Sequence, residues 1–378
     1  MTPATPEPAL RKTLTEETFF LNLGPQHPST HGVLRLLLRL DGERIVTCQP
    51  VLGYSHRGHE HMAQNRTYLQ FMPNPPRMDY LAGLMYNHAY CLAVERACGL
   101  EVPPRAIHIR LICAELNRIS SHLLWFGAYL MDLGAFTPFL YAFDDREDIL
   151  AILGEATGSR LTYSYCRFGG VARDINQAFI DGVRAFIPKM RARLKDYDTL
   201  VTKNIIFVNR TKGVGVISRE RAKAHALTGP CLRASGTAFD IRKAEPYGFY
   251  PQFDFDIPVL TGGDCFDRYM IRLLEIEQSL RIVEQALNRL PAGPVKAEGV
   301  PQFITPPSGQ YHFSYETARG HLGIFLVSDG SRVPYRMKWR VPSLSNLSIL
   351  PVLLPGTLVA DTIAILGSID VVMPEIDR

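Results

Sequence analysis

The sequence predicts an α+β fold in which a helical bundle forms the core and small antiparallel β-sheets flank it. Apolar residues recur at helical spacing through the middle of the chain, whereas apolar and polar residues alternate near both ends. Each alternating region contains an Asp-Gly pair, at Asp41 and at Asp329, which favours a tight hairpin turn. The 378 residues, 46% of them hydrophobic, can bury a large core. We therefore expect one domain over residues 19–378 after a flexible N-terminal segment, residues 1–18.

Period-two alternation identifies the β regions at the two ends of this domain. Residues 19–54 are expected to form a β-hairpin region, in which the leucines of one strand share a face opposite Arg35 and Arg39. Residues 310–378 are expected to form a C-terminal β/α region. The predicted strands cover residues 33–40, 45–48, 322–327 and 335–341.

Residues 58–290 are predicted to form a mostly helical core. Within it, residues 205–262 are expected to be a loop-rich stretch, because glycines, prolines and aromatic residues follow no clear period. Asp174 followed by Gln177 resembles a capping box. Start and stop signals place helices from Asp79 to Gly99, from Pro103 and Pro104 onward, after Asp174, and from Asp267 to Leu290.

One apolar stretch, Leu123 to Phe143, is about long enough to cross a bilayer. It contains Asp132, Gly134 and Pro138, and an isolated carboxylate in the centre of a span is costly in lipid. We predict instead a buried helix that ends in an apolar loop, and no transmembrane segment.

The composition excludes several classes of protein. The net charge is only +4 and the basic residues are spread along the chain, so no nucleic-acid partner is expected. The seven cysteines are scattered and form no Cys-x-x-Cys pair, which indicates a reducing compartment. Residues 1–20 lack the apolar core of a signal peptide and contain several acids, unlike a transit peptide. These features are typical of a prokaryotic cytoplasmic chain.

Two histidines in the stretch Gly24-Pro-Gln-His-Pro-Ser-Thr-His-Gly raise the question of a metal site. His27 and His31 have helical spacing, but Pro28 and Gly32 oppose a helix, so the stretch is predicted to be a turn. His31 is then a loop residue at the mouth of a hairpin. Such a position suits contact with a ligand.

A second cluster, His56, His59 and His61, is the best candidate for a metal site. Zinc would take three such ligands and keep a fourth position open. On one helix, however, His59 and His61 point to different faces, and no HExxH pairing is present. We therefore predict a solvated helix start with no bound metal.

A series of short motifs then occurs in order from about residue 20 to Arg378. The motifs are Gly24–Leu36, Asn65–Gln70, Pro76–Tyr80, Ser121–Leu123, Asp132–Ala135, Gly169–Val171, Leu232–Gly236 and Val327–Gly330. Together they resemble the quinone-site subunit, designated D, of respiratory complex I, the proton-pumping NADH:quinone oxidoreductase.

That family is similar to the large subunit of nickel-iron hydrogenases, so a hydrogenase catalytic chain is a second hypothesis. A hydrogenase needs two Cys-x-x-Cys pairs as thiolate ligands, one early and one near the C-terminus. Residues 66–80 and 367–378 contain no cysteine. The fold implied by the resemblance is therefore like that of a nickel-iron hydrogenase large subunit without the metal site.

The resemblance also implies which residues bind a quinone. In the family, the histidine of the first loop and the tyrosine of Arg-Met-Asp-Tyr hydrogen-bond the quinone headgroup, and an aspartate pairs with the histidine. The matching residues are His31, Tyr80 and Asp132. A quinone takes up two protons on reduction, which an imidazole and a phenol can supply, and a carboxylate favours the imidazolium form. His27 and Arg57 are expected to line the same site.

Two further residues are implied to lie near the terminal iron-sulfur cluster of a partner subunit. Arg77 matches a family arginine at that cluster, and Thr162 stands where the family often has a histidine that takes up a proton as the cluster is reduced. Because threonine does not titrate, the cluster potential is expected to be low and nearly independent of pH. This favours menaquinone over ubiquinone as the substrate, unless His122 supplies the proton.

The implied assembly is a membrane-bound complex that couples quinone reduction to proton translocation. The chain itself is expected to bind no cofactor, while iron-sulfur clusters, and FMN as an open question, belong to partner subunits. The expected partners are the subunit with the terminal 4Fe-4S cluster, other peripheral-arm subunits and membrane-arm subunits, on the cytoplasmic side of a prokaryotic inner membrane. The join between Thr305 and Arg319 is shorter than is common in the family, so the electron donor stays open between NADH and another donor. The alternative is a non-catalytic scaffold subunit of a membrane-bound hydrogenase-like complex, which would not need His31, Tyr80 and Asp132 together.

Overall fold

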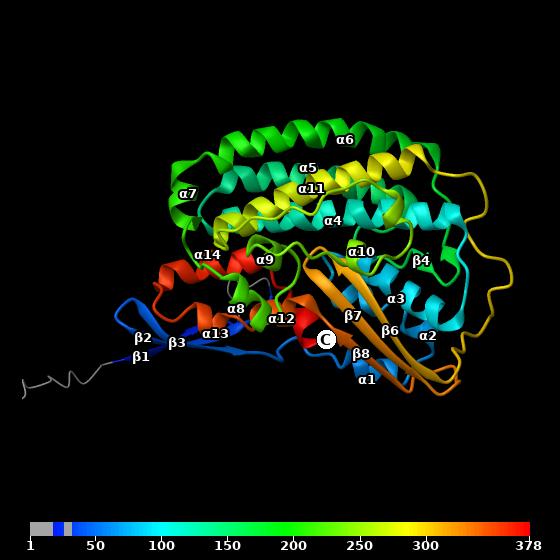
Figure 1. Ribbon diagram of the computed structural model, residues 1–378, viewed down its shortest axis with the longest axis horizontal. Coiled ribbons are helices and arrows are strands. Elements are labelled where there is room, and N and C mark those ends of the chain that lie inside the picture. Colours follow the sequence, from blue (N-terminus) through cyan, green and yellow to red (C-terminus); the bar gives the residue numbers. More distant parts are fainter. Residues whose placement is uncertain (1–17, 26–31) are drawn as a thin grey trace, which may run out of the picture.

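The computed structural model describes residues 18–25 and 32–378 and shows a mixed α+β protein that is mostly helical (Figure 1). Four long helices run side by side across the upper part of Figure 1, and two three-stranded sheets lie below them. The predicted α+β class is thus confirmed. The predicted flexible segment, residues 1–18, lies outside the described residues except for Thr18, whose hydroxyl accepts a hydrogen bond from Arg39 at 2.9 Å.

The four long helices form the bundle. They are α4 (Pro104–Asp132), α5 (Phe136–Thr157), α6 (Gln177–Tyr197) and α11 (Cys265–Asn288). Pro104 occupies the first turn of α4, as predicted, because a proline there loses no helical hydrogen bond. An apolar loop follows α4, as predicted, but it is only three residues long, Leu133 to Ala135, before α5 begins at Phe136.

The predicted capping residues were partly wrong. Asn176, not Asp174, caps α6 by accepting a hydrogen bond from the Phe179 N–H at 2.9 Å. Asp174 instead pairs with Arg105 at 2.9 Å. Likewise α3 (Gly83–Cys98) starts after Ala82 and not at Asp79, although it ends at Gly99 in the left-handed conformation, as expected.

The N-terminal sheet has the order β1-β2-β3, formed by β1 (Phe19–Leu23), β2 (Arg35–Asp41) and β3 (Arg44–Val51). The strands β2 and β3 were predicted, whereas β1 was not. The leucine face of β2 is buried, and it packs in one apolar cluster with residues of two C-terminal helices, α13 (Leu350–Leu353) and α14 (Val359–Ile369).

The C-terminal sheet has the order β6-β7-β8, formed by β6 (Gly309–Thr317), β7 (Gly320–Ser328) and β8 (Arg336–Arg340). The strand β6 was not predicted. A tight turn at Ala318 and Arg319 joins β6 to β7, and the helix α3 packs between this sheet and the bundle. A third, two-stranded sheet pairs β4 (Cys166–Arg167) with β5 (Gly170–Val171).

Short elements fill the connections. The stretch 205–262, predicted to be loop-rich, contains several short helices between its loops. The short elements are α1 (His59–Ala63), α2 (Tyr68–Phe71), η2 (Pro75–Arg77), η3 (Asp198–Thr202), α7 (Ile205–Thr211), α8 (Arg219–Ala224), α9 (Gly229–Ala234), α10 (Ile241–Ala244), η4 (Tyr250–Gln252), α12 (Pro342–Leu347) and α15 (Met373–Asp377).

Candidate functional site

A fully buried arginine joins four distant parts of the chain. The guanidinium of Arg319, in the β6–β7 turn, lies 2.7 Å from Asp79 and 3.3 Å from Asp370, and it donates to the Ser121 hydroxyl of α4 at 3.2 Å. All four side chains are buried. We call Asp79, Ser121, Arg319 and Asp370 the Arg319 cluster. Asp370 also lies 3.7 Å from the guanidinium of a second buried arginine, Arg272.

The Arg319 cluster connects the two segments in which the hydrogenase hypothesis expected cysteine pairs. Asp79 belongs to residues 66–80, and Asp370 belongs to residues 367–378. In place of thiolates around a metal, these segments contribute carboxylates to an arginine. Carboxylate–guanidinium pairs hold the segments together, but they offer no soft ligand for nickel.

Asp79 also fixes the backbone beside the predicted tyrosine. Its carboxylate accepts hydrogen bonds from the N–H groups of Leu81 and Ala82, both at 3.1 Å. The turn before α3 is therefore anchored to the Arg319 cluster. The intervening residue, Tyr80, is consequently held in a defined place.

Tyr80 has the properties of a proton donor to a ligand. Burial raises the pKa of its phenol, the nearby Asp79 and Asp370 carboxylates act in the same direction, and Arg319 opposes them, so the hydroxyl is protonated at neutral pH. The side chain is only partly buried. Within residues 18–25 and 32–378, no hydrogen bond reaches its hydroxyl, which leaves that donor available to a bound molecule.

A third buried carboxyl, that of Glu375, lies close to the Arg319 cluster. Glu375, on the helix α15, accepts hydrogen bonds from the hydroxyls of Tyr86 and Ser343. Its side chain is fully buried and forms no ion pair with any described residue. Burial and the Asp79 carboxylate raise the pKa of Glu375 to about 8.

Of the other two residues predicted to be catalytic, the structure describes only Asp132. His31 lies outside the described residues, as does His27, which was predicted to line the same site. Asp132 is the last residue of α4 and is half-buried. The described residues resume at Gly32, where a Cβ atom would lie 3.1 Å from the Cβ atom of Met373 in α15. Gly32 therefore lies against the helix that carries Glu375.

Arg77 and Thr162 come from neighbouring segments. Arg77 is exposed at the end of η2, and Thr162 is half-buried with a φ of 50°. Between them, the Arg167 guanidinium of β4 lies 3.5 Å from the Met72 sulfur, which brings the two segments together.

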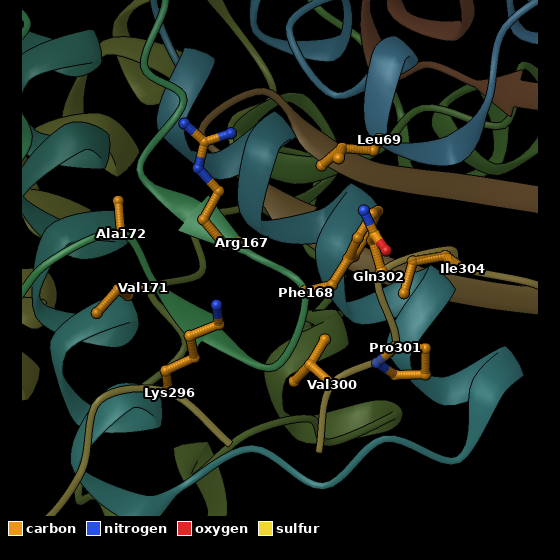
Figure 2. A pocket seen from close by; sticks show the side chains of 10 residues that line it. All are labelled: Leu69, Arg167, Phe168, Val171, Ala172, Lys296, Val300, Pro301, Gln302 and Ile304. Carbon is orange, nitrogen blue, oxygen red and sulfur yellow. The ribbon is translucent and has the colours of Figure 1, made fainter. Parts of the chain in front are cut away.

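A hollow of about 500 Å³ opens beside this contact. Figure 2 shows the side chains of Arg167 and Lys296 at its edge, with Leu69 and Phe168 among the apolar residues that line it. Arg57 is also exposed, on the segment before α1. Arg57 and Arg77 are therefore both exposed cations, and two further basic residues, Arg167 and Lys296, line the hollow.

The histidines at the start of α1 are not brought together as a set of three metal ligands. His59 is only 1% exposed, and burial together with the nearby cations Arg57 and Arg77 lowers its pKa to about 4. The expectation that it is a solvated surface residue was therefore wrong. His56 bonds the backbone oxygen of Asp377 at 2.6 Å. Across the described part of the chain, no group of three histidine, cysteine or acidic residues could hold a metal ion.

Sequence reasoning did not identify Arg319, Asp370 or Glu375 as residues of the site. An Asp or Glu beside apolar residues has several explanations in sequence alone, and the partners of Arg319 lie 240 and 51 residues away. The available signal was the pair of acidic residues in the two segments where a hydrogenase would carry cysteines.

Comparison with known proteins decides the family. The profile of the family described as "Respiratory-chain NADH dehydrogenase, 49 Kd subunit" matches residues 132–378, well over half of the chain. The chain belongs to this family. The NADH-quinone oxidoreductase subunit designated D in Syntrophobacter fumaroxidans is 62% identical over 365 residues, which cover 97% of this chain and 98% of that protein.

Other relatives carry the same name. The protein from Desulfotalea psychrophila is 55% identical over 96% of this chain and 98% of that protein, and the one from Geobacillus thermodenitrificans is 51% identical over 96% and 100%. These relatives, whose names include NADH, match this chain over nearly their full length, so they share its compact length. The chain is a subunit of a multisubunit oxidoreductase of this type, complex I.

In the described ranges, no helix is both long enough and apolar enough to cross a membrane. The apolar sequence of the long helix α4 contains buried charged residues such as Arg110, Glu115 and Arg118. Arg110 pairs with Glu95 of α3, and Arg118 pairs with Glu115.

Proposed function

We propose that this subunit forms the quinone-reduction site of a complex I-type oxidoreductase, beside a partner subunit that carries the terminal 4Fe-4S cluster. The observation that carries the proposal is the Tyr80 hydroxyl, which is protonated, anchored through Asp79 and available to a ligand. The relatives are named as subunits of NADH-quinone oxidoreductase, which supports quinone as the substrate.

In this proposal Tyr80 and His31 bind the two carbonyl oxygens of the quinone headgroup. Each donates a hydrogen bond, and each gives a proton when the quinone becomes a quinol. Asp132 favours the protonated form of His31, because a nearby carboxylate stabilises an imidazolium. His27 and Arg57 line the same site.

The two electrons come from the partner's iron-sulfur cluster. Arg77 and Thr162 belong to the surface that faces this cluster, where the cation of Arg77 favours the reduced cluster. Because Thr162 does not titrate, we assign the quinone to the low-potential menaquinone type. NADH is the donor that the relatives' names support.

The remaining features of the assembly follow the same proposal. The fold is that of a nickel-iron hydrogenase large subunit whose metal site has been replaced, as the carboxylates around Arg319 support. Other peripheral-arm subunits and membrane-arm subunits surround the chain on the cytoplasmic side of the inner membrane. Quinone reduction in this site drives proton translocation by the whole complex.

The variant Tyr80→Phe tests the proposal, since it removes one hydroxyl and keeps the ring. We expect quinone reduction by the intact complex to fall by about 10- to 100-fold, because the lost hydrogen bond is worth about 1–3 kcal/mol. Electron transfer to an artificial acceptor that does not use the quinone site should be unchanged. Tyr335→Phe, at a side chain that is 70% exposed, is the matched control. Wild-type quinone kinetics in Tyr80→Phe would favour the scaffold alternative.

A further inference from the structure

Asn117 of α4 holds the backbone immediately after Tyr80. Its side-chain amide donates a hydrogen bond to the carbonyl oxygen of Leu81 at 3.1 Å, and its amide oxygen accepts one from the N–H of Leu84, also at 3.1 Å. The side chain is only 2% exposed. Both ends of the amide are therefore used on the turn that joins Tyr80 to α3, although its partners lie 36 and 33 residues earlier in the chain.

The start of α3 depends on these bonds because its own cap supplies none. Ala82 precedes α3 and makes no side-chain hydrogen bond that caps the helix. The first N–H groups of a helix have no partner within it, so they need acceptors from elsewhere. Asp79 accepts hydrogen bonds from the two N–H groups just before the helix, and Asn117 accepts one from Leu84 in its first turn. Two residues from distant places in the chain thus share the role of a helix cap.

Ser121 lies one turn after Asn117 on the same face of α4 and supports the same turn. Its hydroxyl accepts a hydrogen bond from Arg319 at 3.2 Å, and the same guanidinium nitrogen binds Asp79 at 2.7 Å. Asp132 ends α4, about three turns further along, and 3.6 residues per turn place it on the same side as Ser121. The helix α4 therefore carries both the support of the tyrosine turn and the carboxylate assigned to the site.

We propose that Asn117 is a positioning residue of the quinone site, which sets where the Tyr80 hydroxyl meets the quinone. The peptide unit between Tyr80 and Leu81 is planar and is held by Asp79, and the next peptide unit is held by Asn117. Together these bonds define the direction in which the tyrosine leaves the backbone. A misplacement of about 1 Å can cost about 100-fold in rate. This inference rests on the proposed function.

A double-mutant cycle between Asn117→Ala and Tyr80→Phe tests the inference in the intact complex. We expect Asn117→Ala alone to lower kcat/KM for quinone by about 10-fold, while electron transfer to an artificial acceptor that does not use the quinone site is unchanged. In the Tyr80→Phe background the same substitution should cost less than about 2-fold, because the hydroxyl that Asn117 positions is already absent. A purely structural role would give the same loss in both backgrounds.

Asn87→Ala is the matched control. Asn87 is also a fully buried asparagine that binds both backbone groups of another segment, since it donates to the Cys166 carbonyl at 3.3 Å and accepts from the Cys166 N–H at 2.8 Å. Asn87→Ala and Asn117→Ala each remove two such bonds, so they should lower the thermal stability of the complex by similar amounts. Any loss of quinone reduction in Asn87→Ala should add to that of Tyr80→Phe.

Should Asn117→Ala not assemble, Asn117→Ser serves as the second variant. Its hydroxyl leaves a polar group for one of the two backbone partners, so less stability is lost than with alanine. The cycle with Tyr80→Phe should then show a smaller single loss and the same non-additivity.

The possible failures are distinguishable. A wild-type rate in the Asn117 variant, or a loss that is equal in both backgrounds, overturns the positioning role, while a slow Tyr80→Phe still supports the quinone site. A wild-type rate in Tyr80→Phe overturns the proposed function and this inference with it.

Discussion

Replacing Thr162 by histidine should make the potential of the partner's terminal iron-sulfur cluster depend on pH. Thr162 is half-buried and has a φ of 50°, in the left-handed region. A β-branched residue is a poor fit there, whereas histidine is among the residues that adopt this conformation more often. The folded chain already holds residue 162 in the left-handed conformation, which costs an L-residue about 1–2 kcal/mol. Histidine adopts this conformation more readily than threonine, so Thr162→His should not disrupt the fold.

The size of the effect follows from proton-coupled electron transfer. One proton taken up for each electron lowers the potential by about 59 mV for each pH unit, because a tenfold change in an equilibrium constant corresponds to 59 mV for one electron. This slope should appear in Thr162→His over the range where its imidazole titrates, around pH 6 to 8. In the wild type the potential should be lower and nearly independent of pH. A low potential keeps electron transfer to menaquinone downhill.

The assay is a redox titration of the intact complex at several pH values, followed by electron paramagnetic resonance. Thr162→Asn is the matched control, since asparagine also tolerates a positive φ but does not titrate. A steep slope in the wild type would refute the reasoning, and its loss in His122→Gln would assign the proton to His122. That side chain is buried, bonds Glu275 at 3.0 Å and has a lowered pKa because of burial, which argues against it.

Two further predictions concern the remaining site residues. His31→Gln and Asp132→Asn should each slow quinone reduction. The double variant should be little slower than either single variant, because one substitution already breaks the pair. Strictly additive losses of activation free energy would argue against the pairing. Elemental analysis should find the same zinc and nickel content in the wild-type complex and in His59→Ala, because His59 is buried among cations and has a pKa of about 4. One tightly held metal that disappears in that variant would restore the metal-site hypothesis.

Patterns confined to single elements were readable from sequence. The alternating leucines of β2 predicted a strand with one buried face, and Pro104 with Gly99 marked the ends of two helices correctly. These patterns are reliable because strand and helix periods depend on neighbours only a few residues away. The absence of cysteine from residues 66–80 and 367–378 likewise argued against a hydrogenase metal site without any structure.

The local environment of each polar residue was decided by tertiary packing. Asp79 looked like a helix cap, but the turn between β6 and β7 brings Arg319 against it, and its main partner is thus 240 residues away. His59 looked solvated, yet packing leaves it 1% exposed.

Glu375 shows the same limit of sequence reasoning most clearly. In the sequence it is one of several acids among apolar residues near the C-terminus, and only the packing of α15 against α3 and α12 buries its carboxyl beside the hydroxyls of Tyr86 and Ser343. The charge state of such a group depends on desolvation and on the cations nearby, and both are properties of the folded chain. Sequence therefore determined most of the elements and the family of this protein, while the fold decided which of its acids are buried and what each of them pairs with.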